Sequence, residues 1–229
     1  MTMSESVAAV PSLPPRVDLK PWFLTLDDLS GRHFSSPDSP RPIAWNAFFG
    51  NDHPVELDVG CGRGLFLFNA AGNRPDVNFL GIELDFREGR RAARRLHKRR
   101  MPNARVLGGS VHDALDRYVP AASVSAIHVY FPDPWWKKKH RRRRVFTDQF
   151  ADRMAKALRP GGMVHSWTDV EEYFGVISAL MDHHPSFKTL PPPDEREPEH
   201  DMDYHTSFER KKRKDGWPIY RGRWQRIAD

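Results

Sequence analysis

The sequence is poor in cysteine and has no long apolar run. Its one cysteine, Cys61, among 229 residues excludes an intrachain disulfide and provides no metal framework by itself. No stretch approaches the ~20 consecutive apolar residues that a membrane-spanning helix needs. The first residues, MTMSESVAAVPSLPPR, lack the basic start and the long apolar core of a secretory signal. The sequence therefore argues against a disulfide-stabilised secreted domain and against a membrane protein, and it favours the cytoplasm.

The net charge is small, but its distribution is uneven. The chain has 36 Lys and Arg against 30 Asp and Glu, a formal charge of +6. Twenty of the 36 cations lie in three runs, Arg87 to Arg100, Lys137 to Arg144 and Arg210 to Lys214. The other 202 residues hold 16 cations and 29 anions, a net charge of −13. An acidic body with three basic patches is the pattern expected of a protein that binds a polyanion.

Hydrophobic patterning divides the chain into an arm and one domain. Residues 1–45 are rich in proline and show no sustained periodicity, so we interpret them as an irregular N-terminal arm. From residue 46 to 229 we expect a single domain, in which short apolar strands alternate with amphipathic helices. The expected strands are 55–59, 77–84, 104–109, 123–131 and 163–169, and the expected helices are 65–71, 86–100, 111–118 and 144–158. This alternation predicts an α/β, Rossmann-like fold with a doubly wound, mostly parallel sheet.

A glycine-rich turn follows the first strand of that domain. Asp58 precedes three glycines, Gly60, Gly62 and Gly64, in a D-x-G-x-G-x-G run that differs from the G-x-G-x-x-G of dinucleotide folds. An acid so close to the turn suits a cationic amino group better than a phosphate. Glu83 ends the second strand, where an acid accepts hydrogen bonds from ribose hydroxyls. A ligand with an ammonium and an adenosine is S-adenosyl-L-methionine, which we favour over a nicotinamide dinucleotide and over a tight turn with incidental acids.

A proline-flanked acid follows the fourth strand. Asp133 lies in the segment Phe-Pro-Asp-Pro-Trp-Trp-Lys that ends at Lys137. Because ligands of open parallel sheets bind beyond the carboxyl ends of the strands, Asp133 should face the reactive end of the cofactor. A planar base could stack on Trp135 or Trp136 while the carboxylate accepts N–H bonds from its edge. The alternative is a rigid loop whose tryptophans pack in the core.

The same segment carries a resemblance to a known family. FPDPWWKKKHRRRR resembles the signature of the tRNA (guanine-N7)-methyltransferases of the bacterial TrmB type, in which PDPW-x-K precedes a basic H-x-x-R-R tail. LDVGCGRG and GIELD resemble the cofactor-binding segments of this family, with Asp58 where a glutamate is usual and Glu83 matching. The WTD that ends in Asp169 resembles a T-D motif, and Thr206 to Glu209 resembles T-x-F-E. The likeness covers about residues 50 to 229.

The resemblance implies the remaining assignments. It implies the fold of a class I S-adenosylmethionine-dependent methyltransferase and transfer of a methyl group to N7 of a guanine in the variable loop of tRNA. It places Asp133 at the junction of base and cofactor, and it assigns Lys137, Asp169 and Thr206 to Glu209 to the substrate. The family has an acid or amide after the third strand that contacts adenine. Ungapped counting puts Ser110 there and a shift puts Asp113 there, so both stay candidates.

The chemistry of this transfer asks for alignment rather than for a base. N7 of guanine has an in-plane lone pair and no proton, so we expect neither a general base nor a metal, and the 11 histidines show no close ligand cluster. Asp133 would bind the Watson–Crick edge and stabilise the cation that forms on the purine. Two alternatives stay open: an amino-methyltransferase acting on another RNA or DNA base, and an RNA-binding relative without activity. The sequence does not decide between monomer and homodimer.

Overall fold

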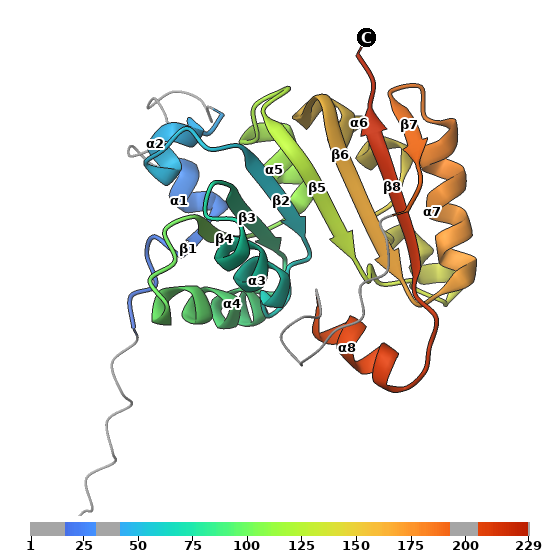
Figure 1. Cartoon of the computed structure of the whole chain (residues 1–229), viewed down its shortest axis with the longest axis horizontal. Coiled ribbons are helices and arrows are strands. Elements are labelled where there is room, and N and C mark those ends of the chain that lie inside the picture. The colour runs from blue at the N-terminus through green and yellow to red at the C-terminus, as the bar shows by residue number, and fades with distance from the viewer. Residues whose placement is uncertain (1–16, 31–41, 193–205, 229) are drawn as a thin grey trace, which may run out of the picture.

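The computed structural model describes residues 17–30, 42–192 and 206–228. Within them, one eight-stranded sheet has the strand order β1-β4-β3-β2-β5-β6-β8-β7 (Figure 1). The strands are β1 (Phe23–Thr25), β2 (Val55–Val59), β3 (Asn78–Glu83), β4 (Ala104–Gly108), β5 (Val124–Tyr130), β6 (Leu158–Thr168), β7 (Phe187–Leu190) and β8 (Tyr220–Arg226). All pairings from β1 through β6 are parallel, whereas β8 pairs antiparallel with β6 and with β7. The prediction of a mostly parallel sheet is confirmed.

Helices cover both faces of this sheet. They are α1 (Leu26–Ser30), α2 (Trp45–Phe49), α3 (Leu65–Asn73), α4 (Phe86–Lys98), α5 (Val111–Arg117), α6 (Asp148–Ala157), α7 (Glu171–His183) and α8 (Ser207–Lys214), with a 3-10 helix, η1, at Lys138–Arg143. Apolar side chains of α3 and α4 pack in one cluster and those of α5, α6 and α7 in another. The strand order reverses at β2, which pairs with β3 on one side and β5 on the other. Such a switch point is where open α/β sheets bind their ligands.

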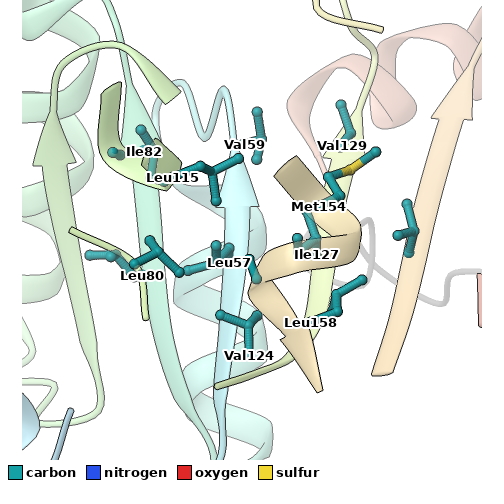
Figure 2. Close-up of a cluster of buried hydrophobic side chains, with 14 of the residues drawn as sticks. Leu57, Val59, Leu80, Ile82, Leu115, Val124, Ile127, Val129, Met154 and Leu158 are labelled. Carbon is teal, nitrogen blue, oxygen red and sulfur yellow. The ribbon is translucent and has the colours of Figure 1, made fainter. Parts of the chain in front are cut away.

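The larger core cluster lies on the face covered by α5, α6 and α7. Leu57, Leu80, Ile127 and Leu158 come from four adjacent strands, and each is almost fully buried (Figure 2). Met154 of α6 lies over them (Figure 2). Strands buried on both faces read as nearly continuous apolar runs, which is why their positions could be predicted from the sequence.

Two predicted boundaries differ from the structure by more than two residues, the start of the helix over 144–158 and the start of the strand over 163–169. The helix predicted over 144–158 begins only at Asp148, because the Thr147 side chain accepts the Phe150 N–H at 3.2 Å and caps it there. The Arg-Pro-Gly-Gly sequence, expected to end this helix, lies inside β6, at a register shift against β5.

Within the predicted arm, β1 pairs with β4 and α1 follows it. The division into an arm and a domain stays a prediction.

Candidate active site

A pocket opens at the carboxyl ends of β2 and β5, beside the switch point. Its lining joins three distant segments: Asp58 with the turn after β2, Tyr130 and Phe131 at the end of β5, and Thr206 and Phe208 at the start of α8. Leu65 and Phe66 of α3 complete the wall. Figure 1 shows α8 beyond the ends of β5 and β6. The site therefore forms only when the chain from Asp58 to Phe208 is folded.

The three glycines of the turn do not have the same role. All are left-handed, with φ of 71° at Gly60, 52° at Gly62 and 67° at Gly64, a conformation that favours glycine. A Cβ at Gly60 would meet nothing within 4 Å, and one at Gly62 only a backbone oxygen at 4.0 Å. A Cβ at Gly64 would lie 2.7 Å from the Cβ of Ala92. Gly60 and Gly62 therefore leave room for a ligand, whereas Gly64 lets α3 pack closely against α4.

Asp58 is an acid at the floor of this pocket. Only 3% of its surface is exposed, and burial, with a further contribution from the charge of Glu83, raises the pKa of Asp58 to about 8. Burying a carboxylate beside another acid is unfavourable unless a cation joins them. The residues present thus fit the ammonium group of S-adenosylmethionine, and the assignment of Asp58 to that group stays a prediction.

Glu83 holds the glycine turn against the end of β3. Its Oε2 accepts the N–H of Gly62 at 2.8 Å and its Oε1 accepts the N–H of Asp85 at 2.8 Å. Carboxylate oxygens have further lone pairs, so these bonds are compatible with the predicted ribose contact. Ser110 and Asp113 follow β4, and Ser110 caps α5 by accepting the Asp113 N–H at 3.4 Å. Neither residue lines the pocket, and the adenine contact of either one stays a prediction.

The loop that carries Asp133 is conformationally unusual. Phe131 and Trp135, on either side of Asp133, have φ of 51° and 43°, in a left-handed region that bulky residues rarely adopt. Such strain persists only where surrounding contacts impose it, and it concentrates at functional sites. Asp133 itself is exposed and follows Phe131 by two residues. Trp136 is 58% exposed, so the alternative in which both tryptophans pack in the core is wrong.

Arg144 holds this loop in place. Its Nε donates to the carbonyl oxygen of Pro134 at 2.7 Å, and its guanidinium lies over the ring of Tyr173, 4.7 Å from the ring centre. Phe131 donates its N–H to the carbonyl of Trp167 at 2.7 Å. The loop is thus tied to β6 and α7. Arg144 therefore differs from the exposed arginines that precede it in the same basic run.

Three of the predicted substrate residues, Asp169, Thr206 and Glu209, lie on α8 or contact it. Thr206 caps this helix by accepting the N–H of Glu209 at 2.9 Å. Glu209 is 3% exposed and pairs with Arg213 at 2.9 Å, whereas Asp169, just after β6, pairs with Lys212 at 2.7 Å. The Asp169 pair ties α8 to the end of the sheet.

The three basic runs differ in their surroundings. In α4, Arg95 is half-buried and the other Arg and Lys side chains are exposed, while Ala92, Ala93 and Leu96 are buried, as the sequence predicted. Lys137 is exposed immediately before η1, which continues the Asp133 loop, and the third run lies on α8 beside the pocket. Two runs therefore adjoin the site.

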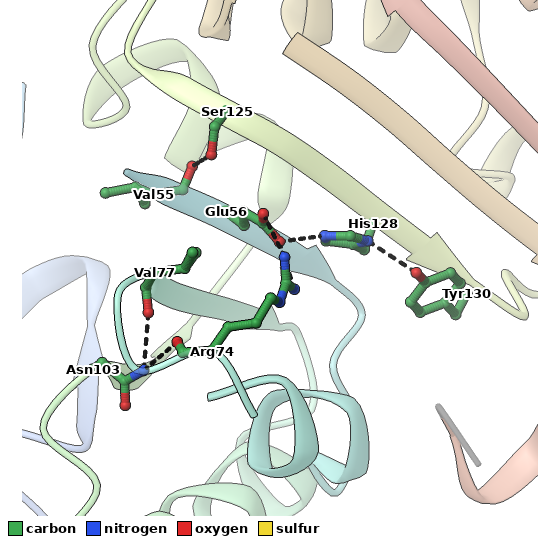
Figure 3. Close-up of polar contacts among 8 residues, drawn as sticks. All are labelled: Val55, Glu56, Arg74, Val77, Asn103, Ser125, His128 and Tyr130. Carbon is green, nitrogen blue, oxygen red and sulfur yellow. Dashed lines mark hydrogen bonds and ion pairs between the residues drawn. The ribbon is translucent and has the colours of Figure 1, made fainter. Parts of the chain in front are cut away.

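Sequence reasoning missed two features of the site. The ring of Phe208 is 64% exposed and stacks on Phe131, with centroids 6.2 Å apart and planes at 20°. A row of polar side chains also leads from Glu56 through His128 to Tyr130 (Figure 3). The signal for this row is present in the sequence, because Glu56 and His128 are polar residues with apolar neighbours on both sides in their strands.

The part of the chain that the structure describes has neither a cluster of metal ligands nor a membrane-spanning helix. No group of three or more His, Cys, Asp or Glu side chains there is arranged to hold a metal ion. No described helix is both long enough and apolar enough to cross a membrane.

Comparisons with known proteins bear on the chemistry of this site. A family model described as "Putative methyltransferase" matches residues 52–222. A tRNA (guanine-N(7)-)-methyltransferase of Rhodopirellula baltica is 40% identical over 93% of this chain and 78% of the relative. The enzyme of the same name from Geobacter metallireducens is 31% identical over 82% of this chain and 83% of its own.

Solved structures agree on the fold. The 16S rRNA methyltransferase KamB has a TM-score of 0.60 at 18% identity, covering 86% of this chain and 96% of its own. A SAM-dependent methyltransferase from Aquifex aeolicus has a TM-score of 0.53 at 12% identity, covering 78% of this chain and 86% of its own. At these identities the likeness shows the fold alone, that of the S-adenosylmethionine-dependent methyltransferases.

Proposed function

The chain belongs to the tRNA (guanine-N7)-methyltransferase family, and on that premise we propose that it methylates N7 of a guanine in the variable loop of tRNA, forming N7-methylguanosine. The methyl donor is S-adenosyl-L-methionine. One observation carries the proposal: the pocket floored by Asp58 is also lined by Phe131, which leads directly into the strained Asp133 loop. Donor site and acceptor loop therefore adjoin each other. Because tRNA is the proposed substrate, we also propose that the protein acts in the cytoplasm.

The residues of the pocket fit the donor group by group. Asp58 would hold the ammonium of the methionine end, and Gly60 and Gly62 would let the donor lie against the backbone. Glu83 would accept from the ribose hydroxyls, and Ser110 or Asp113 would contact adenine. When bound, the donor supplies an electrophilic methyl group on a sulfonium.

The chain's own residues would align the acceptor and stabilise the charge that it gains. N7 is nucleophilic without a general base, so the rate depends on alignment and on electrostatics. Asp133 would accept N–H bonds from the Watson–Crick edge, since N7 and O6 are acceptors that would repel its carboxylate. Lys137, Asp169 and Thr206 to Glu209 would bind the substrate, as the family resemblance implies. Asp169 and Glu209 are each held in an ion pair, with Lys212 and Arg213, which a base edge would have to displace.

Nucleoside analysis tests the reaction directly. The protein is incubated with labelled S-adenosylmethionine and unmodified bulk tRNA, and the tRNA is then digested to nucleosides. We expect the label in N7-methylguanosine, and its mapping to the variable loop would confirm the position. Label on an exocyclic amine would instead assign an amino-methyltransferase, and binding of donor and tRNA without transfer would assign an RNA-binding relative.

Replacement of Asp133 tests its assigned role. We expect Asp133→Ala to lower turnover by about 100-fold or more while donor affinity changes little, because the residue would act on the base. The exposed Asp76, in the turn before β3, provides a matched control as Asp76→Ala. Equal losses of turnover and donor affinity in Asp133→Ala would contradict the role.

A further inference from the structure

A row of four polar side chains leads from Arg74 over β2 and β5 to Tyr130 at the end of β5 (Figure 3). Arg74, which follows α3, donates to the two carboxylate oxygens of Glu56 at 2.8 and 2.9 Å. Nε2 of His128 lies 2.9 Å from the same carboxylate, and Nδ1 of His128 lies 2.9 Å from the hydroxyl of Tyr130. We call these four residues the Arg74–Tyr130 row. Its last member, Tyr130, also lines the pocket that holds Asp58.

The direction of the hydrogen bonds in this row follows from the charge of Glu56. Burial alone would raise the pKa of Glu56, but the bonds from His128 and Arg74 outweigh it and hold the pKa at about 2. The carboxylate can therefore only accept, and Nε2 of His128 must carry the hydrogen. Burial also lowers the pKa of His128, so the ring is neutral and its Nδ1 accepts. The hydroxyl of Tyr130 is consequently the donor to His128.

This bond fixes where the aromatic ring of Tyr130 lies. The hydroxyl hydrogen is directed toward His128, so the hydroxyl cannot also donate to a ligand in the pocket. Phe66 packs edge-on against this ring, with centroids 5.0 Å apart, and Trp167 packs against it at 5.1 Å. A ring held by a hydrogen bond and two aromatic contacts keeps one orientation at little entropic cost on ligand binding.

The pocket combines one acid with aromatic rings. Besides Asp58, its lining includes four aromatic residues, Phe66, Tyr130, Phe131 and Phe208, and no Lys, Arg or His is among the lining residues of the described chain. Aromatic faces attract cations through the negative potential of their π-systems, and such rings recognise ligands with a fixed positive charge. S-adenosylmethionine carries two cations, the ammonium and the sulfonium. Asp58 accounts for only one of them.

We propose that Tyr130 is a specificity-determining residue that recognises the positive charge on the donor's sulfur, and that Glu56 and His128 act as positioning residues that hold its ring. Methyl transfer removes this charge and leaves the neutral thioether of S-adenosylhomocysteine. The same ring would therefore bind the donor more tightly than the spent product and favour product release. The proposal rests on the use of S-adenosylmethionine but not on the identity of the methylated base.

Calorimetric titration of three ligands, without tRNA, tests the proposal. S-adenosylmethionine and S-adenosylhomocysteine differ in the methyl group and the charge, whereas sinefungin carries an ammonium in place of the sulfonium. We expect Tyr130→Leu to weaken the binding of S-adenosylmethionine and of sinefungin about fivefold more than the binding of S-adenosylhomocysteine. Tyr130→Phe keeps the ring and should keep most of this selectivity. His128→Leu should lower the same selectivity ratio, which a merely structural role would leave unchanged. Tyr118→Leu, in a buried tyrosine of the other core cluster, should not change it.

Several outcomes would overturn the proposal. Equal weakening of all three ligands in Tyr130→Leu would show a general contact, and weakening of S-adenosylmethionine alone would show a steric contact with the methyl group. In the unmodified protein, ¹⁵N NMR should find the hydrogen of His128 on Nε2, and a hydrogen on Nδ1 would contradict the positioning role even if a variant failed to fold. Wild-type protein that binds none of the ligands would refute the donor assignment and this proposal together. Failure of methyl transfer to tRNA alone would refute only the proposed function.

Discussion

Glu83 and Asp58 lie near the carboxyl ends of two paired strands, β3 and β2, beside the glycine turn. Glu83 accepts the N–H of Gly62 at 2.8 Å, and its charge adds to burial in raising the pKa of Asp58 to about 8. With a pKa of about 8, Asp58 is therefore mostly protonated at neutral pH before a ligand binds. A cationic ligand would favour the ionised form, so binding and ionisation are coupled.

The first prediction is that ligand binding releases a proton. At pH 7, S-adenosylhomocysteine should displace up to about one proton per site, because its ammonium stabilises the Asp58 carboxylate. Cys61 and Tyr130 face the same acid, but burial raises both of their pKa values, so they stay protonated. Calorimetry in buffers of different ionisation enthalpy measures the release. A binding enthalpy that is the same in all buffers would contradict this coupling.

The second prediction concerns stability without ligand. The pKa of Asp58 is about 8 in the folded chain, against an ordinary value of 3.8 that we expect in the unfolded chain. Between these pH values the unfolded chain is ionised at this residue and the folded chain is not, so the free energy of unfolding falls as pH rises from about 4 to 8. Asp58→Asn removes this cost and should raise the free energy of unfolding at pH 7 by about 2–4 kcal/mol. Its affinity for S-adenosylhomocysteine should fall at least about tenfold. Urea unfolding and calorimetry test both, with Asp76→Asn as the exposed control.

The third prediction concerns acid unfolding. The pKa of Glu56 is about 2 in the folded chain against an ordinary value of 4.5, so its contribution to stability is present above pH 4.5 and is lost as pH falls through 2. Glu56→Gln should lower the free energy of unfolding by about 2–4 kcal/mol at pH 7. The free energy of unfolding of this variant should also fall less steeply as the pH is lowered from about 4.5 to 2. Urea unfolding at a series of pH values measures this slope. An unchanged slope would show that Glu56 is not a source of it.

The fourth prediction separates two arginines of one basic run. Arg144→Ala should lower kcat by about 10–100-fold at nearly unchanged donor affinity, since it releases the Pro134 carbonyl and with it the Asp133 loop. Arg142, two residues earlier, is exposed. Arg142→Ala should instead raise KM for tRNA and reduce the steepness with which tRNA affinity falls with salt. Steady-state kinetics at several salt concentrations distinguish the two, and identical behaviour of both variants would contradict the assignment.

Local patterns account for what could be predicted. The strand that ends in Asp58, the glycines after it and the Asp133 segment are contiguous in sequence, so their residue types indicate both structure and chemistry. The run from Lys137 to Arg144 is uniform, and nothing local separates Arg144 from its neighbours. Only its distance to Pro134 and to the ring of Tyr173 shows that it holds a loop.

The sequence by itself determined the alternation of strands and helices, the acid beside the glycine turn, and a family resemblance that the comparisons confirmed. The tertiary structure alone decided which side chains meet. The Arg74–Tyr130 row depends on β2 and β5 being neighbours with Asp58 opposite His128, although about 70 residues separate them in the chain. Hydrogen bonds and aromatic contacts act over a few ångströms, so their partners are set by strand order and register rather than by spacing along the chain.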